Sequence, residues 1–188
     1  KINVTGEGNT TFAKIIGGYN HYVALKGDGT VWTWGYNPQG NLGLGDKTNR
    51  SKPTKTNMKN VKDIAAGVNF TLVLKKDGTV WATGYNEYGQ LGQNNLTHNI
   101  LPQQMVDANG NEIKEIKEIS AGAYHTIALK EDNTVYTTGY NNCGQQGDGT
   151  TTDKKVLTPI TDEEGNIIKD AKHIKAASDS TIITRQKD

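Results

Sequence analysis

One segment occurs three times along this chain, at a spacing of about fifty residues and with the same order of parts. The copies cover residues 15–43, 64–92 and 119–147, and a fourth copy begins at Ile174. The starting isoleucines are separated by 49, 55 and 55 positions. A fixed period of this length is typical of proteins that stack copies of one small unit of secondary structure. The repeat therefore decides the architecture.

Each copy predicts short antiparallel strands. A nearly continuous apolar run, such as residues 71–74, is followed by a turn pair and a second apolar run. Short apolar runs between turn residues are typical of strands covered on both faces. The pairs Asp28-Gly29 and Asp77-Gly78 predict type I′ hairpin turns, and Asp132-Asn133 is compatible with the same turn. We expect about four strands per copy, with neighbouring copies covering each other.

The later part of each copy contains a proline and a segment of variable length. Pro53, Pro102 and Pro159 are expected at the entry to a later strand, where a missing N–H is tolerated at an edge or first position. From these prolines to the next repeat start there are 11, 17 and 15 positions. The longer segments contain Asn109-Gly110 or Gly165-Asn166, which predict an extra or lengthened hairpin.

We predict a single all-β domain, a partial β-propeller made of about three and a half four-stranded antiparallel blades. Residues 1–14 are interpreted as the closing part of a preceding blade, 15–63, 64–118 and 119–173 as repeats, and 174–188 as the start of a further blade. The chain is therefore interpreted as a fragment of a longer propeller. Since an arc exposes strand edges, three alternatives remain: an open arc, a ring of about eight units closed by a second copy, or completion by the rest of a parent protein.

Bulk composition argues against some partners. Lys and Arg number 21 and Asp and Glu number 20, which does not favour nucleic acid or an anionic membrane. Cys143 is the only cysteine, so the chain forms no internal disulfide. No apolar run approaches the roughly 18 residues that span a bilayer, and no targeting segment is visible at the start.

The residues that the copies share resemble the repeat of the regulator-of-chromosome-condensation family, whose members form propellers, commonly of about seven blades. In the first copy the pattern is carried by Gly18, His21, Leu25, Asp28, Gly29, Val31, Trp34, Gly35, Asn37, Gly40, Leu42 and Gly43. The second copy departs from it at Phe70 and Thr83, and the third at Asn133 and Gln146. The resemblance covers nearly the whole chain and implies the propeller fold. It implies less about function, because one fold carries many functions.

Sequence motifs for catalysis, metals or cofactors are absent. His21 and His125 occupy equivalent repeat positions and are expected to form hydrogen bonds within their own blades, and no two histidines have metal-ligand spacing. Residues 147–153 lack the alternating acidic ligands of a calcium loop. The glycines open no phosphate-binding helix, and no serine has the Gly-x-Ser-x-Gly context. We therefore predict no catalytic residue, no metal and no cofactor.

Three loops combine fixed glycines with a varied interior, at residues 35–40, 84–89 and 139–144. Equivalent loops of successive blades lie side by side, and a rigid frame with a varied interior is typical of a recognition surface. The alternative is that these loops are exposed and vary without function. The candidate partner-binding residues are Tyr19, Asn20, Pro38, Gln39, Asn69, Glu87, Tyr88, Tyr124, Asn142 and Cys143. Tyr36, Tyr85 and Tyr140 are identical in all copies and are expected to pack structurally.

These observations predict a non-enzymatic protein–protein interaction scaffold that binds a protein through one loop face. The sequence is rich in Asn and Lys and in this resembles bacterial members of the family. The resemblance implies that the chain is part of a secreted or cell-surface protein with an inhibitor- or adhesin-like role. The resemblance also leaves open a guanine-nucleotide exchange factor-like propeller acting on a small GTPase. A hydrolase that uses the repeated histidines is a third hypothesis. No nucleic acid and no membrane insertion are expected, whereas self-association through exposed blade edges stays open.

Overall fold

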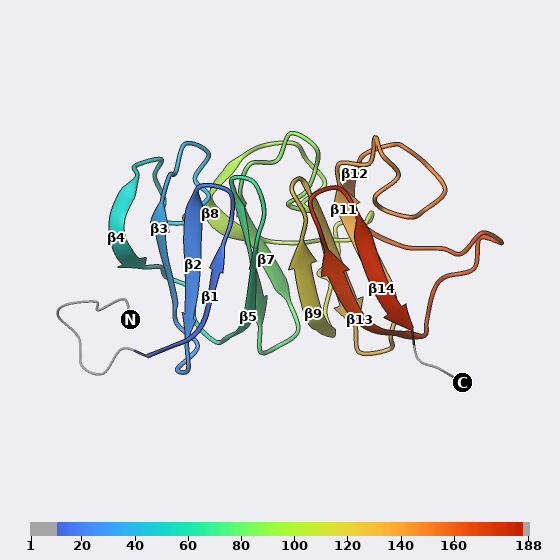
Figure 1. The fold of residues 1–188 in the computed structure, drawn as a ribbon, viewed down its shortest axis with the longest axis horizontal. Coiled ribbons are helices and arrows are strands. Elements are labelled where there is room, and N and C mark those ends of the chain that lie inside the picture. Colours follow the sequence, from blue (N-terminus) through green and yellow to red (C-terminus); the bar gives the residue numbers. More distant parts are fainter. Residues whose placement is uncertain (1–10, 186–188) are drawn as a thin grey trace.

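Fourteen strands form four antiparallel sheets that stand side by side in the computed structural model, which describes residues 11–185 (Figure 1). Blade 1 contains β1 (Phe12–Gly17), β2 (His21–Lys26), β3 (Val31–Gly35) and β4 (Arg50–Lys55). Blade 2 contains β5 (Val61–Ala66), β6 (Phe70–Lys75), β7 (Val80–Gly84) and β8 (Asn99–Gln104). Blade 3 contains β9 (Ile116–Ala121), β10 (His125–Lys130), β11 (Val135–Gly139) and β12 (Lys154–Pro159), and half-blade 4 contains β13 (Ala171–Ala176) and β14 (Thr181–Arg185). The prediction of an all-β fold with four-stranded blades is confirmed.

Strands follow one another within each blade, and the blades meet through their first strands. In every four-stranded sheet the order is first, second, third, fourth. Strand β5 contacts both β1 and β9, and β9 contacts β13, so these four strands form one wall of the molecule (Figure 1). The fourth strands β4, β8 and β12 lie at the opposite edge of their sheets. This radial order is the arrangement of propeller blades.

The prolines lie in these outer strands, but not where the sequence predicts them. Pro53 and Pro102 lie inside β4 and β8, and Pro159 ends β12, so none of them starts a strand. Their missing N–H is tolerated because each outer strand pairs on one side only.

The hairpins between second and third strands are not the expected type I′ turns. Gly29 has a φ of 81°, whereas Asp28 is not in the positive-φ region. Gly29 N donates to Lys26 O and Lys26 N donates to Thr30 O, which is a three-residue loop with a bulge at the glycine. Asn133, with a φ of 67°, takes the glycine's place in blade 3, because asparagine adopts this conformation more readily than most residues.

The lengthened hairpins predicted within the second and third repeats are present. Single bridges join Val106 to Glu112 and Thr161 to Ile167. The first of these segments also supplies Met105 and Ile113 to the core, where both are buried. The first strands begin three residues before the repeat starts assigned from sequence. Residues 1–10, interpreted as part of a preceding blade, and residues 186–188, interpreted as part of the further blade that begins at residue 174, lie outside the described residues.

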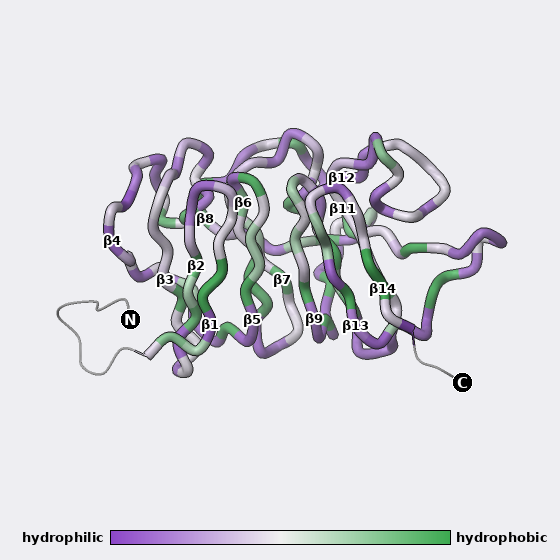
Figure 2. Tube along the Cα trace, viewed as in Figure 1, coloured by the Kyte–Doolittle hydropathy of each residue, from purple (hydrophilic) through white to green (hydrophobic). Residues whose placement is uncertain are grey.

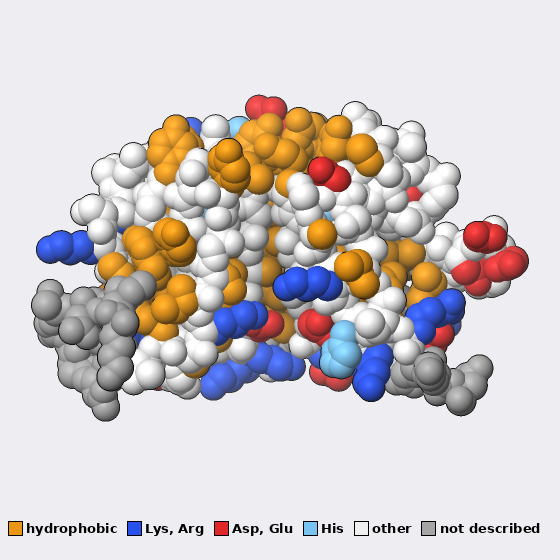
Figure 3. Space-filling view, in the orientation of Figure 1, with side chains coloured by type: hydrophobic (Ala, Val, Ile, Leu, Met, Phe, Trp, Pro, Cys, Tyr) orange, Lys and Arg blue, Asp and Glu red, His pale blue; other side chains and the backbone are white. Residues whose placement is uncertain are grey.

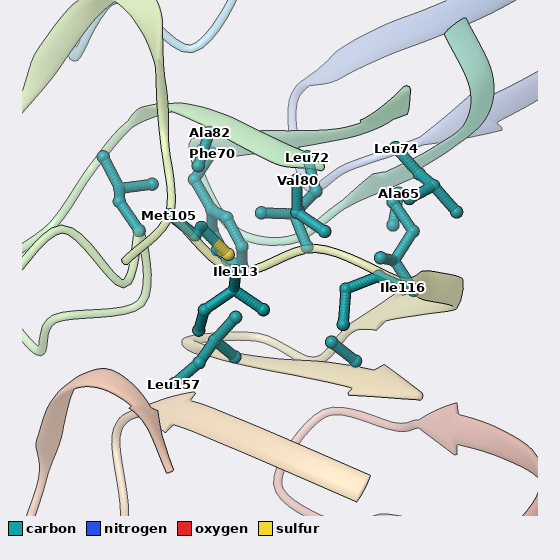
Figure 4. Packing of buried hydrophobic residues seen from close by; sticks show 13 residues of the cluster. Ala65, Phe70, Leu72, Leu74, Val80, Ala82, Met105, Ile113, Ile116 and Leu157 are labelled. Atoms are coloured by element: carbon teal, nitrogen blue, oxygen red, sulfur yellow. The ribbon is translucent and has the colours of Figure 1, made fainter. Parts of the chain in front are cut away.

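The hydrophobic core lies between the blades. Side chains from β6 and β7 of blade 2, among them Leu72 and Val80, meet Ile116 of β9 and Leu157 of β12 in blade 3 (Figure 4). A second cluster joins blades 1 and 2, and a third joins blade 3 to half-blade 4. Five of the six residues of β6 are buried, as expected for a strand covered on both faces. Figure 2 shows the hydrophobic stretches along strands and the hydrophilic turns between them. Each buried Leu or Ile contributes about 1.5–3 kcal/mol, so stability rests on the blade interfaces.

Residues 11–185 contain no helix that is long and apolar enough to cross a membrane.

The repeated histidines connect neighbouring blades, so the expectation of bonds within one blade is wrong. His21 Nε2 lies 2.9 Å from Thr71 Oγ1 of blade 2, and His125 Nε2 lies 3.3 Å from Thr181 Oγ1 of half-blade 4. Phe70 takes the equivalent position in blade 2 and is fully buried. Burial lowers the pKa of His21 to about 4, because the charged imidazolium loses its hydration.

This burial makes stability depend on pH. The unfolded chain binds a proton at His21 near pH 6.5, and the folded chain only near pH 4, so the contribution is intact above pH 6.5 and is lost as pH falls towards 4. Between pH 7 and pH 5 the free energy of unfolding should fall by about 2 kcal/mol on account of His21. His21→Phe introduces the residue that blade 2 has at the equivalent position, Phe70, and should remove this part of the fall in the free energy of unfolding. Urea unfolding at pH 7 and at pH 5 measures the difference. An unchanged pH dependence in the variant would contradict the assignment.

Candidate functional site

A buried asparagine holds each long loop between the third and fourth strands. In blade 2, Asn86 Nδ2 lies 3.0 Å from Asn95 O and 3.1 Å from Thr97 O, and its Oδ1 accepts from Leu91 N at 2.9 Å. Asn37 and Asn141 make the equivalent three bonds in blades 1 and 3. All three asparagines are fully buried. Buried amides with satisfied hydrogen bonds rigidify a segment, so these loops have a fixed shape.

A threonine of the next blade binds each loop. Thr71 Oγ1 donates to Asn41 O at 2.7 Å, and Thr126 Oγ1 donates to Gln90 O at 2.8 Å. The same bond recurs at 2.6 Å between Thr181 Oγ1 and Gln145 O. Since Thr71 gives its proton to Asn41 O, it accepts one from His21 Nε2, which fixes the neutral tautomer of that histidine.

A second threonine strengthens two of these boundaries. Thr83 Oγ1 lies 3.0 Å from Gly40 O and 2.7 Å from Asn99 O of its own blade. Thr138 Oγ1 lies 2.9 Å from Gly89 O and 2.8 Å from Lys154 O of its own blade. Each of these hydroxyls therefore stands between the loop of one blade and the outer strand of the next. We call Thr71, Thr83, Thr126, Thr138 and Thr181 the bridging threonines.

The loop backbone lies directly on the outer strand of the next blade. A Cβ added to Gly89 would stand 2.5 Å from the Cα of Lys155 in β12, and one added to Gly40 would stand 2.5 Å from the Cα of Ile100 in β8. Both glycines have positive φ, near 80°. Asn94 N also donates to Lys155 O at 2.8 Å. Only glycine allows this approach, so each loop belongs structurally to two blades.

Four tyrosines from two blades meet on the loop face, which is the end of the molecule that carries the long loops and the turns between first and second strands. Tyr88 is central: its ring centroid lies 4.8 Å from that of Tyr140, 5.4 Å from Tyr124 and 6.0 Å from Tyr85. The His98 ring packs on Tyr85 at 5.0 Å. We call Tyr85, Tyr88, Tyr124 and Tyr140 the tyrosine cluster. Each is half-buried, and Figure 3 shows hydrophobic side chains gathered along this edge, above β5, β9 and β13.

A carboxylate lies at the rim of the cluster. Glu87 is exposed, and its Oε2 accepts from the Tyr85 hydroxyl at 2.7 Å. Burial, followed by the nearby Glu87, raises the pKa of Tyr85 well above its usual range, so this hydroxyl remains a donor. His98 Nδ1 accepts from Asn86 N at 3.0 Å, which turns its Nε2 towards Glu87 Oε1 at 3.9 Å.

The structure brings together some of the residues selected from sequence and separates others. Glu87, Tyr88 and Tyr124 lie in one site. The remaining candidates lie elsewhere on the loop face: Tyr19, Asn20 and Asn69 in turns between first and second strands, and Pro38, Gln39, Asn142 and Cys143 in the loops of blades 1 and 3. Whether they bind a partner stays a prediction. None of the described residues forms a group of three or more metal-ligating side chains that could hold an ion.

Sequence reasoning missed Tyr85, Tyr140 and His98. The two tyrosines are identical in every copy, which favoured a structural role, and they do pack, but on Tyr88 and Tyr124, which are half-buried on the loop face. Tyr36 holds the same position in blade 1 and is 47% exposed, and Gln39 stands there where blade 2 has Tyr88. The feature of the sequence that could have identified this site is the second tyrosine of the blade 2 loop, Tyr88, which has no counterpart in the other two loops.

Sheets that pack face to face between blades, with first strands side by side, define a repeat protein of the β-propeller class. The Regulator of chromosome condensation (RCC1) repeat matches residues 28–74 and 77–129, and a second description of the same repeat matches residues 13–41, 61–90 and 116–145. The first match covers more than half of the chain, which therefore belongs to the RCC1 repeat family.

Several known proteins are similar to this chain. The ultraviolet-B receptor UVR8 of Arabidopsis thaliana is 35% identical over 143 residues, which are 74% of this chain and 32% of UVR8. The human E3 ubiquitin-protein ligase HERC2 is 35% identical over 133 residues, 69% of this chain and 3% of that protein. Prp20p of Saccharomyces cerevisiae shares the fold with a TM-score of 0.79 at 22% identity, over 96% of this chain and 45% of Prp20p. The chain thus spans about a third of UVR8 and matches part of an RCC1 propeller.

Two glycine substitutions test the contact between a loop and the next blade. Gly89 and Gly110 have similar φ, 80° and 81°, but a Cβ at Gly110 would meet nothing within 4 Å. Gly110→Ala should cost about 1–2 kcal/mol of unfolding free energy from backbone strain alone. Gly89→Ala should cost about 1–3 kcal/mol more, because its Cβ collides with β12. Urea unfolding measures both, and equal costs would contradict the contact.

Proposed function

We propose that this chain is a non-enzymatic protein-binding scaffold that holds its partner on the loop face, with the tyrosine cluster at the centre of the interface. The observation that carries this proposal is the position of Tyr88. Its loop is closed by Asn86 and bound by Thr126 and Thr138 of the next blade, so the ring is held in place before any partner arrives. A preorganised anchor loses little conformational entropy on binding.

The chemistry of the cluster fits a protein interface. Tyrosine is enriched among residues that dominate binding energy, because it offers a rigid apolar ring together with a hydroxyl. Monomeric surfaces seldom gather several aromatic side chains without a use. The histidines support a non-enzymatic role, because His21 and His125 are buried between blades and a substrate does not reach them.

Similar proteins bind other proteins, which agrees with the proposed role. Yeast RCC1 (Prp20) has been crystallised with Kap60, and Prp20p has described binding properties to Gsp1p and histones. From these we carry over only the class of partner, a protein. We further propose that the chain belongs to a secreted or cell-surface bacterial propeller protein with an inhibitor- or adhesin-like role, which the Asn/Lys-rich style of its repeats supports.

A second candidate is a guanine-nucleotide exchange factor-like action on a small GTPase, which the shared fold with Prp20p favours. Release of fluorescent GDP from a loaded small GTPase measures it. We expect no acceleration by this chain, and a faster release would place this candidate first.

The main proposal is tested by a photo-crosslinking residue at position 88, with position 22 as the matched site. Tyr22 is 50% exposed but lies on β2 of blade 1, away from the tyrosine cluster. The partner captured through position 88 should bind the purified chain, and Tyr88→Ala should weaken its affinity by about thirtyfold, corresponding to the 2 kcal/mol of a typical anchor. Tyr22→Ala should bind within about twofold of the native chain. Equal affinities of native and Tyr88→Ala chains for every captured partner would rule out this surface.

A further inference from the structure

We propose that the tyrosine cluster and Glu87 together recognise an arginine side chain of the partner protein. This inference rests on the proposed function, since it names the chemistry that the loop face accepts.

The geometry of the rings places a ligand on the cluster and not inside it. The centroids of contacting tyrosines lie 4.8 to 6.4 Å apart, with interplanar angles of 59° to 74°. Rings this close are in direct contact with each other and leave no room for a side chain between them. A partner group therefore lies on the exposed ring surface, where an aromatic face attracts a cation.

Glu87 supplies a charge beside that surface. Its Oε2 accepts from Tyr85, and its Oε1 is 3.9 Å from His98 Nε2, beyond hydrogen-bond distance. A guanidinium is planar, so it stacks on a tyrosine while its N–H groups reach a carboxylate at the ring edge. An apolar side chain would use the rings but would make no contact with the carboxylate of Glu87.

The charges around the cluster include paired cations, one exposed carboxylate and one opposing lysine. Arg50 pairs with Asp46 at 2.7 Å and Lys154 pairs with Asp148 at 3.1 Å, so these loop-face cations are engaged. Asp179 is exposed in the turn between β13 and β14, and that turn binds the neighbouring turn through Ala123 N and Ser178 O. Lys155 is the exposed cation beside Gly89, and it opposes a positive ligand. The chain uses ring–cation contact elsewhere: Lys75 Nζ lies 3.9 Å from the Trp81 ring centroid.

The test uses blocked tripeptides, Gly-Arg-Gly and Gly-Leu-Gly, titrated into the full chain while the tyrosine ring resonances are followed by NMR. The arginine peptide should shift the Tyr88 and Tyr124 rings in a saturable manner, and the leucine peptide should bind at least fivefold more weakly. Glu87→Gln should weaken the arginine peptide at least fivefold, and Lys155→Gln should not weaken it. Glu163→Gln is the matched control, because Glu163 is exposed in the hairpin after β12.

Two results would overturn this inference. One is a leucine peptide that binds the cluster as well as the arginine peptide, which would leave the protein-binding proposal standing with an apolar anchor. The other is arginine binding that Glu87→Gln and Glu163→Gln affect equally. Failure of the proposed function itself would appear in the crosslinking experiment, as a captured partner whose affinity for the chain is unchanged by Tyr88→Ala.

Discussion

The hydrogen bond between a threonine hydroxyl of one blade and a loop carbonyl of the blade before it determines how this molecule is put together. It occurs at all three boundaries among the described residues, through Thr71, Thr126 and Thr181. Hydrophobic packing holds the blades face to face, but such packing is not directional. The threonines supply direction, because a hydroxyl must meet a particular carbonyl. They therefore set where each loop lies.

The tyrosine cluster is a consequence of that arrangement. Tyr88 comes from the loop of blade 2, yet its nearest ring partner in the cluster is Tyr140 of blade 3. The bridging threonines and Gly89 bring the loop onto blade 3, so the surface exists only where two blades meet. A single repeat would not display it. The same frame in blade 1 carries Gln39 in place of Tyr88, which leaves Tyr36 apart from any such cluster.

The repeat pattern was enough to predict blades, the number of strands in each and two-sided burial, because the period and the apolar runs can be read directly from the sequence. Contacts between repeats were harder. His21 was expected to bind within its own blade, since nothing in one repeat shows that Thr71 of the next lies 2.9 Å away. Tyr85 and Tyr140 were assigned to packing because they recur, although recurrence does not exclude exposure. The type I′ turn failed because Asp-Gly suits a bulged three-residue loop equally well.

Direct evidence for this account would come from the nuclear Overhauser effects between the Tyr88 and Tyr140 rings in a Thr126→Val, Thr138→Val double variant. The variant keeps the volume of both side chains and removes two hydroxyls, that of Thr126, which binds Gln90 O, and that of Thr138, which lies near both Gly89 O and Lys154 O of blade 3. The account predicts that the Tyr88–Tyr140 effects disappear, while those within blade 3, such as His125 to Gly139, persist. Unchanged effects between the two tyrosines would show that the bridging threonines do not place the loop.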